Sequence, residues 1–222
     1  MPGITRRRVL AGSAVLPVAG AMEAHGDPGA APNRFAPAIP GREVMRRRYF
    51  PDVLLTTHEG RQVRFYDDLL KDKIVVLGLM YARCTGACPL VTSNLVNVQR
   101  LLRDRMGHDL FIYSLTVKPE EDTPERLKAY ATMHGVGPGW SFLTGKPDDV
   151  ELLRHKLGFA DVNPAIDRDK SRHSGMLRYG NERLALWGSC QGQAKPEWIV
   201  EEISFVMPPG APMAPMSQAG GS

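Results

Sequence analysis

Two cysteines at a short spacing carry most of the chemistry that this sequence offers. Cys84 and Cys88 lie in residues 84–89, directly after an apolar run that ends at Met80. Four residues correspond to about one helical turn, so both sulfur atoms can lie on one face of a helix. Two thiols in that arrangement can bind one soft metal ion or close one disulfide. The residues alone leave both chemistries open, together with the plainer alternative of a buried, unreactive pair.

The place of the cysteines in the chain favours reactive thiols. The apolar run before them predicts a buried strand, and the pattern after Pro89 predicts an amphipathic helix. Cys84 is therefore expected near the start of a helix, where the positive end of the helix dipole stabilises a thiolate. Both metal ligation and disulfide exchange need that thiolate.

Length and composition indicate one domain with a core of its own. The chain has 222 residues, of which 43% are hydrophobic, and a formal charge of +4. Arg6, Arg7 and Arg8 supply three of its 28 basic residues, and residues 1–21 contain no acid. The rest of the chain is close to neutral and has no basic stripe interleaved with aromatic residues, so the sequence does not predict nucleic-acid binding.

Residues 1–21 are typical of an export signal. Paired arginines precede an apolar stretch from Val9 to Ala21, which ends in the small-x-small sequence Ala19-Gly20-Ala21. The arginines favour the Tat route over an ordinary secretory signal. The stretch is shorter than the roughly 20 apolar residues of a membrane span, so we expect a cleaved signal rather than a retained anchor. An exported, periplasmic protein meets an oxidising environment, which gives the cysteine pair added meaning.

The remaining sequence divides into a lead, a folded domain and a tail. We expect a flexible lead at 22–44, a folded domain at 45–207 and a disordered tail rich in Pro, Met and Gly at 208–222. Strands alternate with helices in the domain, which predicts an α/β fold whose central sheet is covered on both faces. The predicted strands are 53–57 and 62–65 (a hairpin), 73–81, 110–116, 141–143, 175–179 and 183–187, and the predicted helices are 90–102, 124–133, 146–157 and 196–205.

Four segments, in the right order, resemble the Sco/SenC family. Residues 81–89 resemble its CxxxCP motif, and residues 114–124 resemble its segment with the pattern S-hydrophobic-DPExDTP. Residues 139–145 match its GWxFLTG segment, and residues 169–174 align with its DHS segment. The resemblance runs from about Thr56 to Phe205. Four ordered segments are far more specific than one pair of cysteines.

This resemblance implies a thioredoxin-like domain: a central mixed β-sheet flanked by helices, with an N-terminal β-hairpin. It also implies a copper ion held by Cys84, Cys88 and His173. Two thiolates suit Cu(I), and an imidazole completes a three-coordinate site or, with a further oxygen donor, holds Cu(II). The implied role is a copper chaperone that delivers the ion to a cytochrome c oxidase subunit or a related cuproenzyme. Contact with a membrane surface would then be transient and through that client.

A second role needs the same cysteines but no histidine. In a periplasmic thiol-disulfide oxidoreductase, Cys84 and Cys88 are the catalytic residues, cycle through a Cys84–Cys88 disulfide, and act on the client's cysteines. The spacer of three residues, rather than two, favours metal. A thiol peroxidase is weaker, since Leu77 and Tyr81 stand where peroxiredoxins have proline and threonine. A structural zinc site is weaker still, because such sites take four protein ligands.

The chain departs from the family pattern at several places, which makes it a divergent member. Arg172 replaces the acid that precedes His173, and such an acid can orient a ligating imidazole. Asp167 and Asp169 are candidates to replace it. Lys118 stands where the family has aspartate.

Other sulfur and imidazole groups are given plainer roles. We expect Cys190 to be an unpaired thiol in a loop, and the tail residues Met213 and Met216 to be without function, although thioethers can recruit Cu(I). The remaining histidines are expected at the surface in loops: His25, His58, His108, His134 and His155.

Overall fold

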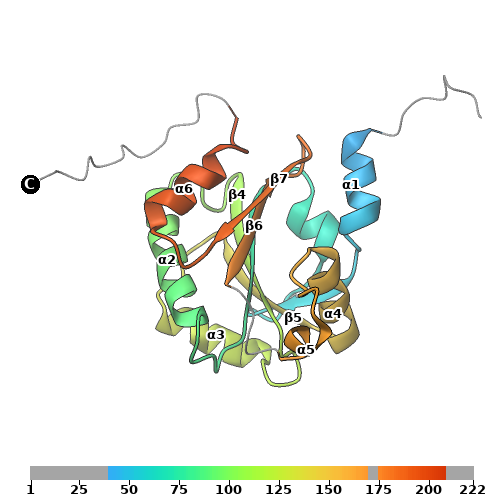
Figure 1. The fold of residues 1–222 in the computed structure, drawn as a ribbon. Helices are drawn as coiled ribbons and strands as arrows, with labels where there is room; N and C mark the ends of the chain where they lie inside the picture. The colour runs from blue at the N-terminus through green and yellow to red at the C-terminus, as the bar shows by residue number, and fades with distance from the viewer. Residues whose placement is uncertain (1–39, 170–174, 209–222) are drawn as a thin grey trace, which may run out of the picture. The chain divides into compact units, whose positions relative to one another are not determined.

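The computed structural model of the chain describes residues 40–169 and 175–208 (Figure 1). The predicted export signal, most of the predicted lead, His173 with Arg172, and the methionines of the predicted tail lie outside these residues. No helix within the described ranges is both long and apolar enough to span a bilayer.

The described residues form one mixed sheet with helices on both sides. The sheet has seven strands in the order β2-β1-β5-β4-β3-β6-β7, and β3, β4 and β5 run parallel while the other pairings are antiparallel. The strands are β1 Leu54–Thr57, β2 Gln62–Arg64, β3 Ile74–Met80, β4 Leu110–Thr116, β5 Trp140–Gly145, β6 Met176–Asn181 and β7 Leu186–Gln191. The helices are α1 Gly41–Tyr49, the π-helical turn η1 Phe65–Leu70, α2 Cys88–Leu101, α3 Pro124–Met133, α4 Pro147–Lys156, α5 Pro164–Asp167 and α6 Pro196–Ser204.

Strand β3 lies in the interior of this fold. All seven of its residues are buried, as expected of a parallel-sheet strand covered on both faces. It pairs with β4 along one edge and with β6 along the other. Helices α2, α3 and α6 lie on one side of the sheet, and α1, α4 and α5 lie on the other (Figure 1). The connections β3-α2-β4 and β4-α3-β5 step in the same direction, which puts α2 and α3 on one face.

The long apolar and capped segments form where the sequence predicts them. The buried runs become β3 and β4, and α3 begins after Thr123, whose Oγ1 accepts a hydrogen bond from the Arg126 backbone N–H at 3.4 Å. That is the capping arrangement expected for Thr followed by Pro124.

The turn predicted at Gly180 and Asn181 is wrong. Both residues lie inside β6, and the chain reverses over residues 182–185, where Ala185 has a φ of 53°. Gly180 stays in the strand because the indole of Trp187 covers it: a Cβ at Gly180 would lie 2.3 Å from that ring. Here glycine is used for close approach rather than for a turn.

Helix α1 is a second difference, because it begins at Gly41, inside the predicted lead. It buries none of its own residues. Arg42 attaches it to the core through Glu182, with Nε–Oε1 and Nη2–Oε2 distances of 2.7 and 2.5 Å. The Tyr66 hydroxyl donates to the same carboxylate at 2.7 Å, so a buried acid satisfied by several donors joins α1, η1 and the turn after β6.

Gly139 fixes the approach to β5. Its φ is +81°, and a Cβ there would lie 2.3 Å from the backbone nitrogen of Gly107. Gly60, in the β1–β2 turn, has the same φ of +81° but open space around its Cα. The two glycines therefore separate the cost of a left-handed backbone from the cost of a steric clash.

We expect Gly60→Ala to lower the free energy of unfolding by about 1 to 2 kcal/mol, the cost of a left-handed non-glycine residue. Gly139→Ala should cost about 1 to 3 kcal/mol more, because backbone atoms cannot move aside as a flexible side chain can. Urea unfolding followed by circular dichroism measures both. Equal losses for the two variants would contradict the close contact at Gly139.

Candidate metal centre

The two cysteines lie in the connection between β3 and α2. Cys88 is the first residue of α2, with Pro89 next to it, whereas Cys84 lies in a turn where its N–H donates to the Tyr81 carbonyl at 3.1 Å. The expectation that one helical turn carries both sulfurs is therefore wrong. The loop nevertheless brings the two side chains into hydrogen-bond contact. The two cysteines are not joined in a disulfide, and they are 8% and 2% exposed for Cys84 and Cys88.

The environment of Cys84 stabilises its thiolate. Burial raises the pKa of this thiol, but hydrogen bonds from the Cys88 side chain, from the backbone N–H groups of Cys88 and Gly86, and from the Tyr81 hydroxyl more than offset it. The net effect is a lowered pKa. Cys84 is thus the sulfur that presents negative charge to a soft cation or to a disulfide.

Cys88 has the opposite character. Burial is the main cause that raises the pKa of its thiol, and the hydrogen bond to Cys84 raises it further, because Cys88 donates to the neighbouring thiolate. Of the two sulfurs, the outer one of Cys84 therefore ionises more readily, and the inner one of Cys88 holds its proton more tightly. A metal ion bound by both sulfurs must displace that proton.

Tyr81 links the outer thiol to a nearby cation. Burial and then the hydrogen bond to Cys84 raise the pKa of Tyr81 to about 12, so its hydroxyl remains a donor. The Lys118 Nζ lies 4.6 Å from the centroid of the Tyr81 ring, and it also pairs with Glu121 at 3.4 Å. Lys118, which stands where the family has aspartate, therefore contacts Tyr81, whose hydroxyl donates to the Cys84 thiolate.

A buried carboxylate anchors the cysteine loop to β4. Asp122 is 1% exposed and accepts hydrogen bonds from the Thr116 hydroxyl at 2.5 Å and from the Ala82 N–H at 3.1 Å. The Thr116 oxygen in turn accepts from the Lys118 N–H at 3.0 Å. The segment 114–124 thus holds the backbone two residues before Cys84.

His173 lies outside the described residues, and the described residues on either side of that gap are Asp169 and Gly175. The charge of Asp169 contributes to the raised pKa of Tyr81, so that side chain lies near the ring. A Cβ at Gly175 would lie 3.3 Å from Val91 Cγ2, on the first turn of α2 after Cys88.

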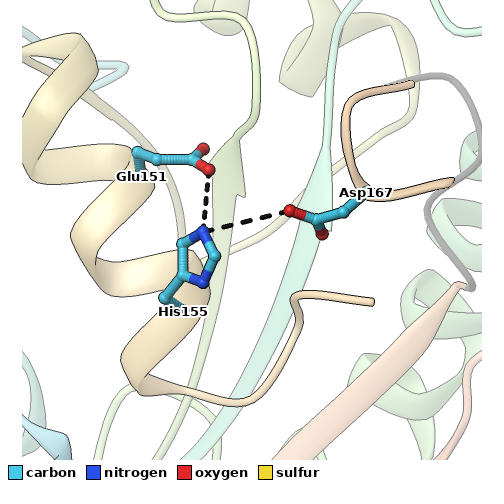
Figure 2. A group of neighbouring side chains, drawn as sticks. All are labelled: Glu151, His155 and Asp167. Carbon is cyan, nitrogen blue, oxygen red and sulfur yellow. Dashed lines mark hydrogen bonds and ion pairs between the residues drawn. The ribbon is translucent and has the colours of Figure 1, made fainter. Parts of the chain in front are cut away.

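A second polar cluster joins α4 and α5 (Figure 2). His155 Nε2 lies 3.0 Å from Glu151 Oε1 and 3.9 Å from Asp167 Oδ2, and in the described part of the chain this is the one group of three such side chains with ligating geometry. The histidine lies in α4, within the helix predicted at 146–157.

Arg154 binds the carboxylate oxygens of this cluster. Its guanidinium pairs with both carboxylate oxygens of Asp167 at 2.5 and 2.6 Å and with Glu151 at 2.6 Å. Hydrogen bonding to Arg154 holds the pKa of Asp167 far below its usual range. The cluster is therefore an ion-pair network that fastens α5 to α4, with both carboxylate oxygens of Asp167 bound by Arg154.

Cys190 is buried in β7, opposite Leu177 of β6, and not in the loop expected from the sequence. Burial raises its pKa to about 12, so it is an inert thiol. Neither its strand position nor the roles of Tyr81 and Asp122 were predicted. The signal in the sequence for the role of Tyr81 was its position, three residues before Cys84.

The model of the family described as SCO1/SenC matches residues 46–207. The chain belongs to the SCO1/SenC family. It is 31% identical over 117 residues to a SCO1 protein homolog of Bacillus subtilis, which covers 52% of this chain and 59% of that protein. The match therefore spans less than two thirds of that relative.

Solved structures of the family share the fold. Bradyrhizobium japonicum ScoI with copper bound matches with a TM-score of 0.56 at 21% identity, covering 69% of this chain and 96% of that one. BsSco, described as a Sco-family cytochrome c oxidase assembly protein with a disulfide switch, matches with a TM-score of 0.57 at 22% identity, covering 69% and 90%. The mixed sheet flanked by helices is thus the thioredoxin-like fold of Sco proteins.

Removal of the Asp122 carboxylate should loosen the cysteine loop. We expect Asp122→Ala to lower the free energy of unfolding by about 2 to 3 kcal/mol, because buried hydrogen bonds to a charged group are lost. Glu120→Ala, an exposed acid two residues earlier, is the matched control and should stay within about 0.5 kcal/mol of wild type. Urea unfolding of the reduced chain tests this, and equal stability of the two variants would contradict the anchoring role.

Removal of the Tyr81 hydroxyl should make Cys84 less acidic. Tyr81→Phe deletes one donor to the thiolate, so the pH at which Cys84 becomes reactive should move upward and its alkylation at neutral pH should slow severalfold. Iodoacetamide alkylation followed by peptide mass spectrometry across pH measures this. Tyr113→Phe is the control, since burial rather than a thiol raises the pKa of Tyr113. A Tyr81→Phe profile that overlays wild type would refute the contact.

Proposed function

We propose that this protein binds one copper ion through Cys84, Cys88 and His173 and delivers it to a client. The observation that carries the proposal is the pair of buried thiols, not joined in a disulfide, at the β3–α2 junction, with the pKa of Cys84 lowered. Membership of the SCO1/SenC family and the copper held by Bradyrhizobium japonicum ScoI support the choice of metal. Thiolate sulfur and imidazole nitrogen are a donor set suited to copper.

The two unequal thiols suit a metal that must be held and then released. Copper would meet the Cys84 thiolate first, and Cys88 would join as it loses its proton, so binding would strengthen with rising pH. Thr85 and Gly86, between the two cysteines, are exposed. A client ligand could therefore reach the ion from that side and exchange with one sulfur at a time.

The client we propose is the copper site of a cytochrome c oxidase subunit or a related cuproenzyme. BsSco, which shares this fold, is described as an assembly protein for cytochrome c oxidase. Residues 1–21, with their paired arginines, support export through the Tat route to the periplasm, where such a client presents its copper site.

A thiol-disulfide oxidoreductase is the second candidate, and the asymmetry of the thiols favours it. An outer sulfur with a lowered pKa and an inner sulfur with a raised one suit attack by Cys84 and resolution by Cys88. The client would be the same protein in its disulfide form. This chemistry does not use His173.

The test compares His173→Ala with His155→Ala in the fully reduced chain. Anaerobic Cu(I) titration against a competing chelator should give one copper per chain for wild type and for His155→Ala, because Arg154 occupies the acids around His155. For His173→Ala, copper affinity should fall by about tenfold or more, as expected for loss of one ligand. Reduction of a disulfide-bonded client peptide, measured in parallel, should be alike in all three proteins.

Equal copper retention by both histidine variants would remove His173 from the ligand set. Absence of competitive copper binding in wild type would overturn the copper proposal and leave the oxidoreductase. Loss of copper from His155→Ala alone would contradict the ion-pair interpretation of the cluster in Figure 2.

A further inference from the structure

A cleft of about 430 Å³ lies on the sheet face opposite α2. It is bordered by the end of α1, the end of α4, and the strands β3, β6 and β7. Successive strand residues point to opposite faces. Accordingly Leu177 contacts the α2 side, whereas Arg178 reaches the end of α4 and donates to the Gly158 carbonyl at 2.6 Å. The volume is in the range of small-molecule pockets.

Two buried donors of this cleft have no acceptor. Arg178 Nε and Trp187 Nε1 are enclosed and make no hydrogen bond among the described residues, although both residues line the cleft. The other buried indole behaves as expected, because Trp140 Nε1 donates to Ser114 Oγ at 3.0 Å. Buried polar groups are nearly always paired, so two unpaired donors in one cleft indicate an absent acceptor.

The unpaired donors are held in place by their surroundings. The Trp187 ring packs on Phe50, with 4.6 Å between centroids, and covers Gly180. Arg178 is fixed by its bond to Gly158, where a Cβ would lie 2.8 Å from Nη2. Both donors therefore belong to side chains that a ligand would find already oriented, which lowers the cost of binding.

The charged residues that line the cleft favour a negatively charged ligand. Arg178 and Lys156 line it, and none of its lining residues is an acid. The carboxylates that pair with the lining residue His155, those of Glu151 and Asp167, are also bound by Arg154. Its other lining residues are mostly apolar or aromatic, including Tyr49, Phe50 and Leu157, and the polar ones are His155 and Ser189. The cleft thus combines net positive charge with an apolar body.

We propose that this cleft binds a hydrophobic monocarboxylate, a function separate from the dithiol. The carboxylate offers two acceptor oxygens, enough for Arg178 Nε and Trp187 Nε1. Its body, aromatic or aliphatic, packs against the rings and leucines of the walls. The guanidinium makes this a charge-assisted contact, the stronger class of hydrogen bond.

The test follows the indole N–H signals of the three tryptophans in a ¹⁵N-labelled chain titrated with 2-naphthoate. The Trp187 signal, assigned by its loss in Trp187→Phe, should shift, whereas those of Trp140, already bonded, and of the exposed Trp198 should not. 2-Naphthamide, a neutral molecule of the same shape, should bind at least about tenfold more weakly. Decanoate as a second probe distinguishes an aliphatic from an aromatic body.

Calorimetric measurement of 2-naphthoate affinity in substituted chains tests the same proposal. Arg178→Met should weaken 2-naphthoate binding by about tenfold or more, while Arg183→Met, an exposed arginine in the β6–β7 turn, should bind as wild type does. A Trp187 signal unmoved by both acids, equal binding of 2-naphthamide, or wild-type affinity in Arg178→Met would each overturn the proposal. The indole signals of the unaltered chain decide the matter even if a variant does not fold.

Discussion

The burial of β3 is the constraint on which the rest of the structure depends. Its seven consecutive buried residues need a neighbour strand on each edge and a helical layer on each face. The chain leaves this covered strand at Met80 and enters the cysteine loop, which therefore begins from a fixed point at the carboxyl edge of the parallel strands. Ligand sites of α/β sheets form at that edge because the loops there are free to vary.

Burial and hydrogen bonding compete at the two thiols, and the outcome differs between them. Both are enclosed, which opposes a thiolate, yet only Cys84 collects enough donors to reverse the effect. Those donors are in place because Asp122 holds the loop at Ala82 and because Tyr81 comes directly from β3. The chemistry of the pair thus depends on contacts between β3 and β4 as much as on the cysteines themselves.

The sequence predicted what local pattern determines. The apolar runs of β3 and β4, the caps of α3 and the cysteine pair are all local signals, and they were sufficient for the layer order. Contacts over long sequence separations were not predictable: Glu182, which attaches α1, and Asp122, which pins Ala82, act on partners 140 and 40 residues away. The turn after β6 was misplaced for the same reason, since Trp187 is what makes Gly180 a strand residue.

The cleft and the dithiol use the same strand without being coupled through it. Leu77 lines the cleft, and Met80, three residues on, ends β3 before the cysteine loop. Energetic coupling between two sites needs an element with two discrete arrangements that both ligands bias. Every residue of β3 is buried and both its edges are paired, which opposes a second arrangement of the strand. Occupation of the cleft would therefore leave the acidity of Cys84 unchanged, and the two sites are independent uses of one rigid sheet.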